Sequence, residues 1–479
     1  MAEARVHRIA VVGGGIAGLA AAHRLTEIAR EKNLALEILL IEERERVGGA
    51  VATERVDGFV VEAGPDSFIS AKPWALALCE RLGLGDRLIS TNPSRQTVLV
   101  VRSGRAVPLP EGFLLMAPTR FLPLLTTPLF SLGGKLRMAA EYFTPRGAAR
   151  EDESLASFVT RRFGPEALDR VVQPLIGGIY AADPEKLSLA ATMPRFLEME
   201  RSRGSVIKGM LREKRESPAQ RADTGARWSL FLSLAGGMQE LVDAIAARLP
   251  EGCVRTGTRV TGISWNPATK SWTMIGDGDS ADVDGVILAT PAYASAALIG
   301  QAAPGISRLL DDIPYTSTAT VSLAYGEEDV PRELGGFGMI VPAIEKRKIL
   351  ACTFSSVKYA GRAPAGAVLL RAFVGGALQP ELFDQDDAAM EASVQRELKE
   401  LLGIDGQPIF ARVHRHPRAM PQYPVGHLAS MRRIEQELQS YPTLRVAGNA
   451  YYGVGIADCV HSGETAAEEI VKALATAPL

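Results

Sequence analysis

Residues 8–18 read RIAVVGGGIAG, and this stretch decides the fold. Arg8 to Val12 is mostly apolar and β-branched, which predicts a buried strand. Gly13, Gly15 and Gly18 then break the strand and open an alanine-rich helix. The first glycine permits a tight turn, the second lets a pyrophosphate approach the backbone, and the third lets the helix pack closely on the strand. The free N–H groups and positive dipole end of such a helix are suited to binding a phosphate.

A second strand and an acidic residue extend this pattern. Leu36 to Ile41 is the predicted strand, and Glu42 follows it, 24 residues past Gly18. A carboxylate in this place accepts hydrogen bonds from the hydroxyls of a ribose. A glycine triplet alone is weak support. The strand before it, the helix after it and the acid after the second strand together predict a dinucleotide site.

Composition limits the class of protein. The 479 residues suffice for two or three domains, and 47% hydrophobic and 23% charged residues are typical of a globular protein with a large core. The net charge of −2 gives no basic field, so we expect no nucleic-acid partner. The four cysteines lack metal-ligand spacing and are too few for a disulfide scaffold. MAEARVH leaves no room for a targeting peptide, so we expect a cytoplasmic protein. Because of the cysteine spacing, we expect no metal centre.

Local patterns predict further elements along the chain. Strands over Val51–Arg55 and Phe59–Glu62 are joined by an Asp57-Gly58 turn, and Asp66 or Ser67 is expected to cap a helix over residues 73–83. A hairpin follows, and then the strand signal disappears from Gly112 to about Met210. The strands of the hairpin are 97–102 and 106–109, and later strands are expected at 228–234, 254–265, 271–275, 286–290, 319–325, 349–354, 367–374, 409–414 and 444–447. Helices are expected at 239–249 and 386–402, and the loop GNAYYGVGIADCV leads into a last helix with apolar residues at 467, 470, 471 and 474.

Two stretches allow more than one interpretation. Residues 113–132 read FLLMAPTRFLPLLTTPLFSL, but Arg120 and three prolines exclude one straight spanning helix. Short helices there would either lie on a membrane surface or pack internally. Arg201 to Arg227 is charged and lacks aromatic residues, which favours a mobile loop or a solvated helix.

Several longer motifs resemble a known family. RIAVVGGGIAGL, LLIEERERVGG and the late GVGIADC are similar to the flavin amine oxidase and phytoene desaturase superfamily. Three internal motifs resemble the protoporphyrinogen and coproporphyrinogen oxidases more specifically, and the likeness covers essentially the whole chain. These are GGIYAADPEKLSL (Gly177–Leu189), GFGMIVP with FSSVKYAGRAP (Gly336–Pro364), and AMPQYPVGH (Ala419–His427).

The resemblance implies an α/β fold and a reaction. It implies noncovalently bound FAD, because Cys459 does not match the covalent attachment motif of monoamine oxidases. It also implies oxidation by dioxygen of coproporphyrinogen III, protoporphyrinogen IX or both to the porphyrin, with hydrogen peroxide released, in haem synthesis. The expected parts are a discontinuous Rossmann-like FAD-binding domain (1–75, 229–300 and 415–479), an α+β substrate-binding domain with a mixed sheet (76–112 and 301–414) and a mainly helical insert (113–228).

By the family pattern, cofactor-binding residues come from four regions of this chain. The pyrophosphate and ribose are expected at Gly13, Gly14, Gly15, Ile16, Ala17, Gly18, Glu42 and Glu43, and the adenine at Val260. The flavin is expected along Gly49, Ala50, Gly64, Pro65, Asp66 and Ser67. Val454, Gly455 and Ile456 would present backbone N–H groups and a helix N-terminus to the pyrimidine edge, where partial positive charge stabilises the reduced, anionic flavin.

The substrate side is expected at Gly177, Gly178, Ile340, Thr353 and Phe373, although plain core packing would also explain such residues. His416 stands where family members often have Trp, and it either contacts flavin or lies on the surface. Val98 stands where eukaryotic enzymes have a propionate-binding Arg. The candidates for the missing charge are Arg95, Arg102 and Arg371. We assign no catalytic residue, since hydride transfer to flavin demands no dedicated acid–base pair and the histidines at 414, 416, 427 and 461 are scattered singly.

Alternatives remain at the level of sequence. Another flavin oxidase, acting on an amine or a polyene, would share the glycine motifs but not the internal ones. A non-catalytic FAD-binding or membrane-scaffold protein would lose the substrate-side motifs, which are present here. Within the family, the departure at Val98 means that the sequence supports coproporphyrinogen III and protoporphyrinogen IX as the substrate almost equally, with a slight preference for coproporphyrinogen III. Contact with the inner face of the plasma membrane and a homodimer are further expectations.

Overall fold

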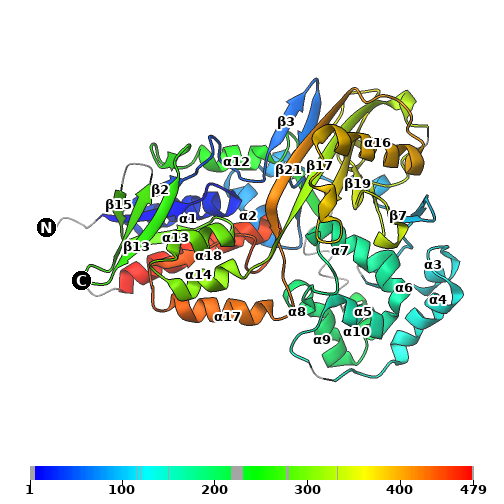
Figure 1. Cartoon of the computed structure of the whole chain (residues 1–479), viewed down its shortest axis with the longest axis horizontal. Coiled ribbons are helices and arrows are strands. Elements are labelled where there is room, and N and C mark those ends of the chain that lie inside the picture. Colours follow the sequence, from blue (N-terminus) through cyan, green and yellow to red (C-terminus); the bar gives the residue numbers. More distant parts are fainter. Residues whose placement is uncertain are drawn as a thin grey trace.

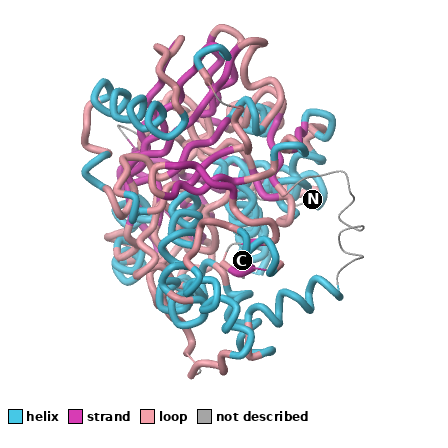
Figure 2. The backbone as a smooth tube through the Cα atoms, turned by 90° about the vertical axis from the view of Figure 1, so that its right-hand side faces the viewer, coloured by secondary structure: helices cyan, strands magenta, loops and turns pink. Residues whose placement is uncertain are grey.

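The structure is a computed structural model that describes residues 6–114, 116–118, 120–148, 150–216, 230–276, 280–331 and 333–476. Residues 1–5 of the N-terminal stretch, and residues 217–227 of the charged segment, lie outside these ranges. Figure 1 shows a sheet with its helices on the left, a second sheet at the upper right and a helical region below it. Figure 2, seen from the right-hand side of Figure 1, shows most strands in the upper half and many helices below.

A five-stranded parallel sheet carries the glycine motif. Its strand order is β12-β2-β1-β16-β22, so three segments far apart in the sequence share one sheet. The strands are mostly apolar without alternation, as expected where both faces of a parallel sheet are buried. Their bounds are β1 His7–Val12, β2 Leu36–Ile41, β12 Val254–Arg255, β16 Gly285–Leu288 and β22 Leu444–Val446.

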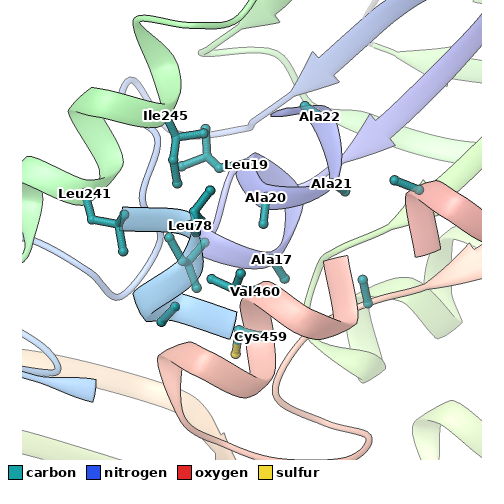
Figure 3. Packing of buried hydrophobic residues seen from close by; sticks show 14 of the residues in the cluster. Ala17, Leu19, Ala20, Ala21, Ala22, Leu78, Leu241, Ile245, Cys459 and Val460 are labelled. Carbon is teal, nitrogen blue, oxygen red and sulfur yellow. The ribbon is translucent and has the colours of Figure 1, made fainter. Parts of the chain in front are cut away.

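Helices cover this sheet on both faces. Ile9, Val11, Ile38 and Leu40 point into a core shared with four helices, and Figure 3 shows side chains of that core. The intervening residues of the same strands point into a second core on the other face. The first core is covered by α1 Ile16–Lys32, α2 Pro73–Arg81, α12 Gln239–Ala246 and α18 Ile456–Thr476. The second core is covered by α13 Ala292–Ile299, α14 Pro304–Asp311 and α17 His427–Leu438. A small sheet of β13 Val260–Asn266, β14 Ser271–Gly276 and β15 Ser280–Val283 also packs on the second core.

The second sheet is seven-stranded and mixed. Its order is β21-β17-β20-β19-β18-β7-β8, and all neighbours pair antiparallel except β18 and β7, which are parallel. One face packs on α16 Asp387–Leu402. The strands are β7 Val98–Arg102, β8 Arg105–Pro108, β17 Tyr315–Gly326, β18 Gly338–Ile340, β19 Ala351–Phe354, β20 Ala367–Gly375 and β21 Phe410–Pro421.

The helical region lies between the sheets in sequence. Its main helices are α3 Phe121–Thr126, α4 Leu132–Ala139, α5 Leu155–Phe163, α7 Gln173–Tyr180, α9 Pro194–Arg203 and α10 Val206–Glu216, packed around a separate apolar core. In the described part of this region the strands are only two residues long, β9 Phe113–Leu114 and β10 Ala117–Pro118. Within the described ranges no helix combines the length and apolar composition needed to cross a membrane.

Several local predictions differ from the structure. Lys72 is the N-cap residue of α2, and its side chain makes no capping hydrogen bond. The prediction that Asp66 or Ser67 caps this helix is therefore wrong. The carboxylate of Asp66 is instead held by Arg371 of β20 and by Lys358, which lies between β19 and β20. The charged segment after residue 201 is partly packed, because Val206 and Ile207 of α10 are buried. The Asp57-Gly58 hairpin turn is confirmed, with φ angles of 46° and 85° between β3 Thr53–Val56 and β4 Phe59–Glu62.

Candidate functional site

The glycine turn between β1 and α1 forms an open cradle. Gly13 has a φ of +106°, which favours glycine. A Cβ added to Gly18 would lie 1.9 Å from the carbonyl oxygen of Gly13, so the close approach of helix and turn requires glycine there. A Cβ added to Gly15 would meet nothing within 4 Å. The space in front of Gly15, at the start of α1 where no side chain caps the helix, therefore fits a pyrophosphate.

A second glycine turn lies against the first. The N–H of Gly48 donates to the carbonyl oxygen of Gly14 at 2.7 Å, and Gly49 has a φ of +59°. Arg46 holds this turn by donating to the carbonyl oxygens of Gly49 at 2.8 Å and Val51 at 3.2 Å. Sequence reasoning missed Arg46, although its place just before the glycine pair was a usable signal.

Glu42 lies at the junction of the two turns. Its buried carboxylate accepts hydrogen bonds from the N–H groups of Gly14 at 2.7 Å and Arg44 at 3.0 Å. The acid after β2 thus lies at the glycine turn, as its place in the dinucleotide fingerprint requires. The next residue, Glu43, is exposed, and Val260 begins β13, where it packs against the second core of the parallel sheet.

The segment from Glu62 to Ser67 connects these turns to the second sheet. A Cβ added to Gly64 would lie 1.9 Å from the carbonyl oxygen of Ala50, so two expected flavin segments touch. The carbonyl oxygen of Ala63 accepts from Thr320 Oγ1 at 3.0 Å and from His416 Nε2 at 2.9 Å. Since a carbonyl only accepts, Nε2 of His416 carries the proton and Nδ1 is an acceptor. Burial lowers the pKa of His416, which favours the neutral ring.

A buried ion cluster holds the same segment. Asp66 contacts Lys358 Nζ at 2.9 Å and Arg371 Nη2 at 3.1 Å. Arg371 Nη1 also donates to the carbonyl oxygen of Gly64 at 2.7 Å. Burial alone would raise the pKa of Asp66, but Lys358 and Arg371 hold that pKa below its ordinary value. Asp66 is therefore a charged anchor between the cofactor-side segment and the second sheet.

One face of the seven-stranded sheet brings the expected substrate residues together. Ile340 pairs with Ala351, and Ala351 pairs with Phe373 on the next strand. Thr353 pairs with Arg371 two residues away, so it lies on the same face. Phe373 lies under the guanidinium of Arg371, at 5.0 Å from the ring centroid. The face that carries Ile340, Thr353 and Phe373 therefore also holds the Glu62–Ser67 segment.

Two further segments border this face. Helix α7 contacts β18, and its Gly178 is exposed, with nothing within 4 Å of an added Cβ, whereas Gly177 is buried. Val454, just before α18, packs against the apolar core that includes Ile340 and borders Phe373. The segment that leads into α18 at Ile456 therefore borders the same apolar core as the substrate-side residues.

The structure gives different surroundings to the three arginines that are candidates for binding a substrate carboxylate. Arg371 is buried and bonded to Asp66, so it is not available as a propionate ligand. Arg95 forms an ion pair with Glu333, and Arg102 lies at the end of β7 opposite Arg105. Val98 lies on the site face, because it pairs with Gly338, which pairs with Thr353.

Comparisons with known proteins agree over nearly the whole chain. The chain is 36% identical over 470 residues to "Coproporphyrinogen III oxidase" of Bacillus subtilis, covering 98% of both, and 28% identical to "Protoporphyrinogen oxidase, mitochondrial" of Nicotiana tabacum, covering 98% of this chain and 95% of the relative. A crystal structure from Exiguobacterium sp. 255-15, provisionally named a protoporphyrinogen oxidase, superposes with a TM-score of 0.86 at 30% identity, covering 98% of this chain and 100% of that one. Residues 16–471 match the sequence pattern described as flavin containing amine oxidoreductase. The chain therefore belongs to the flavin containing amine oxidoreductase family.

Proposed function

We propose that this chain is an FAD-dependent oxidase that removes six electrons and six protons from a porphyrinogen in haem synthesis. Three molecules of dioxygen would accept them, giving three of hydrogen peroxide. One observation carries the proposal: the sheet face with Ile340, Thr353 and Phe373 is bonded directly to the Glu62–Ser67 segment that is expected along the flavin. The names of the relatives, which are porphyrinogen oxidases, support the same substrate class.

The cofactor residues are proposed from the open cradle at Gly15 and the turns around it. The start of α1 would hold the pyrophosphate, Glu42 would hold the ribose, and Gly49–Ala50 with Gly64–Ser67 would hold the isoalloxazine. FAD is held without a covalent bond, since the thiol of Cys459 is buried in α18. We keep the three-part division into an FAD-binding domain, a substrate-binding domain and a helical insert, since three chain segments share the parallel sheet and the mixed sheet is separate.

Bound flavin supplies the hydride acceptor for each oxidation step. The protein would position the tetrapyrrole over the sheet face that carries Phe373 and Ile340 and exclude water from it, because both side chains belong to or border an apolar core. His416 contributes a neutral ring held at Ala63 and no charge. No residue is assigned as acid or base.

Coproporphyrinogen III is the preferred substrate in this proposal. The support is that relatives with 33–36% identity bear that name, whereas relatives named protoporphyrinogen oxidase are 28–29% identical. Arg371 is committed to Asp66, so a substrate propionate must find another cation.

The test uses the purified holoenzyme. The protein should be yellow, and anaerobic coproporphyrinogen III should bleach its flavin absorbance. In air, porphyrin fluorescence should rise well above autoxidation, and faster than with protoporphyrinogen IX in a parallel assay. Bleaching by an amine or a polyene, with no porphyrin formed from either porphyrinogen, would instead favour the other flavin oxidases. A yellow protein that no substrate bleaches would be a non-catalytic FAD-binding protein.

A membrane-contact surface is also proposed. Leu122, Leu125, Leu132, Leu136 and Phe143 are exposed large apolar side chains on α3, α4 and the turn Ala140–Phe143. Leu136 and Phe143 lie beyond residue 132, so the exposed apolar side chains continue from the stretch 113–132 along α4 and into the following turn. Contiguous exposed apolar side chains favour an interaction surface, and we propose peripheral contact with a lipid bilayer.

A further inference from the structure

The starts of α1 and α18 lie at one edge of the parallel sheet. Both helices follow parallel strands, β1 and β22, and both pack in the same core, as Ala17 and Val460 show in Figure 3. A Cβ added to Gly463 would lie 2.1 Å from the carbonyl oxygen of Ala17, so the helices cross closely there. Ile456 lies seven residues earlier, about 10 Å along a helix that rises 1.5 Å per residue. Helix α18 therefore begins beyond the start of α1, at the carboxyl edge of the strands where nucleotides bind.

An ion pair lies at this start. Lys72 Nζ contacts Asp458 Oδ1 at 2.6 Å and Oδ2 at 2.8 Å. Asp458 is the third residue of α18, and its side chain is 13% exposed, whereas that of Lys72 is 42% exposed. The carboxylate folds back on the preceding loop, because a Cβ added to Gly455 would lie 3.2 Å from Oδ2. This loop is the one proposed to face the flavin.

Asp458 also borders the substrate side. Tyr180 ends α7, the helix that carries Gly177 and Gly178. Burial first and the nearby charge of Asp458 second raise the pKa of Tyr180 to about 12. The carboxylate thus contacts the proposed cofactor loop and is close enough to act electrostatically on the end of the proposed substrate helix.

The charge of Asp458 opposes what this helix end would otherwise provide. A helix N-terminus stabilises negative charge nearby, and the reduced flavin carries more negative charge than the oxidised flavin. A bare carboxylate in the first turn would cancel that effect and disfavour flavin reduction. The ammonium of Lys72, bound to both carboxylate oxygens, restores local neutrality.

We propose that Lys72 is the counter-charge that keeps Asp458 from lowering the reduction potential of the bound FAD, so that the ion pair as a whole leaves this potential nearly unchanged. The inference rests on the proposed function, because it uses the proposed place of the Val454–Ile456 loop beside the flavin.

The test is a spectroelectrochemical titration of the purified holoenzyme without porphyrinogen. Lys72→Met should lower the midpoint potential of the FAD and Asp458→Asn should raise it. A tenfold change in the reduction equilibrium corresponds to about 30 mV for a two-electron couple, and we expect shifts of that order. Lys72→Arg and the double variant Lys72→Met/Asp458→Asn should both stay near the wild-type potential.

The chain contains a matched control. Arg81 and Glu464 form an ion pair between α2 and α18, with side-chain exposures of 37% and 13%, and Lys72 directly precedes α2. Glu464 lies six residues beyond Asp458, about 9 Å further along α18. Arg81→Met and Glu464→Gln should therefore leave the potential unchanged.

Two outcomes with the FAD-loaded protein would overturn the proposal. In the first, Lys72→Met and Asp458→Asn shift the midpoint potential of the FAD in the same direction, or by no more than the control variants do. The other is an unchanged potential with a raised KM for porphyrinogen in Lys72→Met, which would assign Lys72 to a substrate carboxylate. Opposite shifts in a yellow protein that oxidises no porphyrinogen would uphold this inference while the proposed function fails. A protein that binds no FAD would overturn both.

Discussion

At the scale of single residues, two glycines of one turn have separable roles. Gly15 has a φ of −68°, which alanine adopts freely, and an added Cβ meets only open space. We expect Gly15→Ala to fold with a free energy of unfolding within about 0.5 kcal/mol of wild type, since it disturbs no contact. The new methyl would occupy the space proposed for the pyrophosphate, so the Kd for FAD should rise at least about tenfold, or about 1.4 kcal/mol.

Gly18→Ala provides the contrast to this variant. Its Cβ would overlap the carbonyl oxygen of Gly13, so the apoprotein itself should be destabilised by about 1–3 kcal/mol or more. Chemical denaturation of both apoproteins and fluorescence titration with FAD measure the two effects. If Gly15→Ala bound FAD as tightly as wild type, the cradle would be assigned wrongly.

Asp66 predicts how stability depends on pH. Its pKa is held below the ordinary value of 3.8, so the folded state favours the ionised carboxylate. The resulting stabilisation is fully present above pH 3.8 and is lost as the pH falls through the lower folded-state pKa. Asp66→Asn should cost about 3–5 kcal/mol at pH 7, because Lys358 and Arg371 lose a buried counter-charge.

Urea unfolding at several pH values checks this prediction. The difference in free energy of unfolding between wild type and Asp66→Asn should be constant from neutral pH to about pH 5 and shrink below about pH 4. The exposed Asp312 serves as control, and Asp312→Asn should leave the acid limb of wild type unchanged. A difference that persisted undiminished to the lowest pH at which the protein folds would contradict the charged anchor.

At the scale of elements, local pattern predicted β1, α1 and β2 well because each is specified by its own residues. The apolar runs of β1 and β2 and the glycines between them leave little choice. Helices α13, α14 and α17 were missed, since AYASAALI in α13 is apolar on most sides and lacks a clear period. The bounds of β21 were too short because its second half, through Pro421, is held by pairing with β17 rather than by β propensity.

The candidate site was predictable only where motifs marked it. The glycine turns and the residues Ile340 and Phe373 were named from motifs, and the register of the mixed sheet now places them on one face. The bond from Arg371 to Gly64 joins residues 307 positions apart, and no local pattern reports such a contact. Sequence reasoning therefore left Arg371 as one of three candidate cations for the substrate, whereas in the fold Arg371 joins two elements.

Helix α4 and the turn that follows it, Ala140–Phe143, carry the prediction that belongs to this scale. Leu132, Leu136 and Phe143 are 71%, 62% and 81% exposed, so serine at all three positions should barely change the melting temperature. Loss of apolar side chains should reduce co-sedimentation with liposomes several-fold. Ile409, 57% exposed after α16, is the control, and Ile409→Ser should pellet like wild type. Equal pelleting of the triple variant would mean that this surface does not bind lipid.

At the scale of the whole molecule, Arg371 joins the cofactor side to the substrate side. It is buried, bonds Gly64 and Asp66, and lies over Phe373. Arg371→Met should leave Asp66 with Lys358 alone, lower stability by about 3–5 kcal/mol, and weaken FAD binding because Gly64 loses its donor. Kd for FAD and KM for porphyrinogen should therefore rise together.

The matched comparison is Arg162, a fully buried arginine that binds Glu141 inside the helical region. Arg162→Met removes a buried charge of the same kind and should destabilise the protein similarly, because Glu141 loses its partner. Its Kd for FAD, measured below the melting transition, should stay at the wild-type value, since no contact of Arg162 reaches the glycine turns. Arg371 has a positioning role only if its variant weakens FAD binding and the Arg162 variant does not. If the two variants had equal Kd values for FAD, Arg371 would contribute to stability alone.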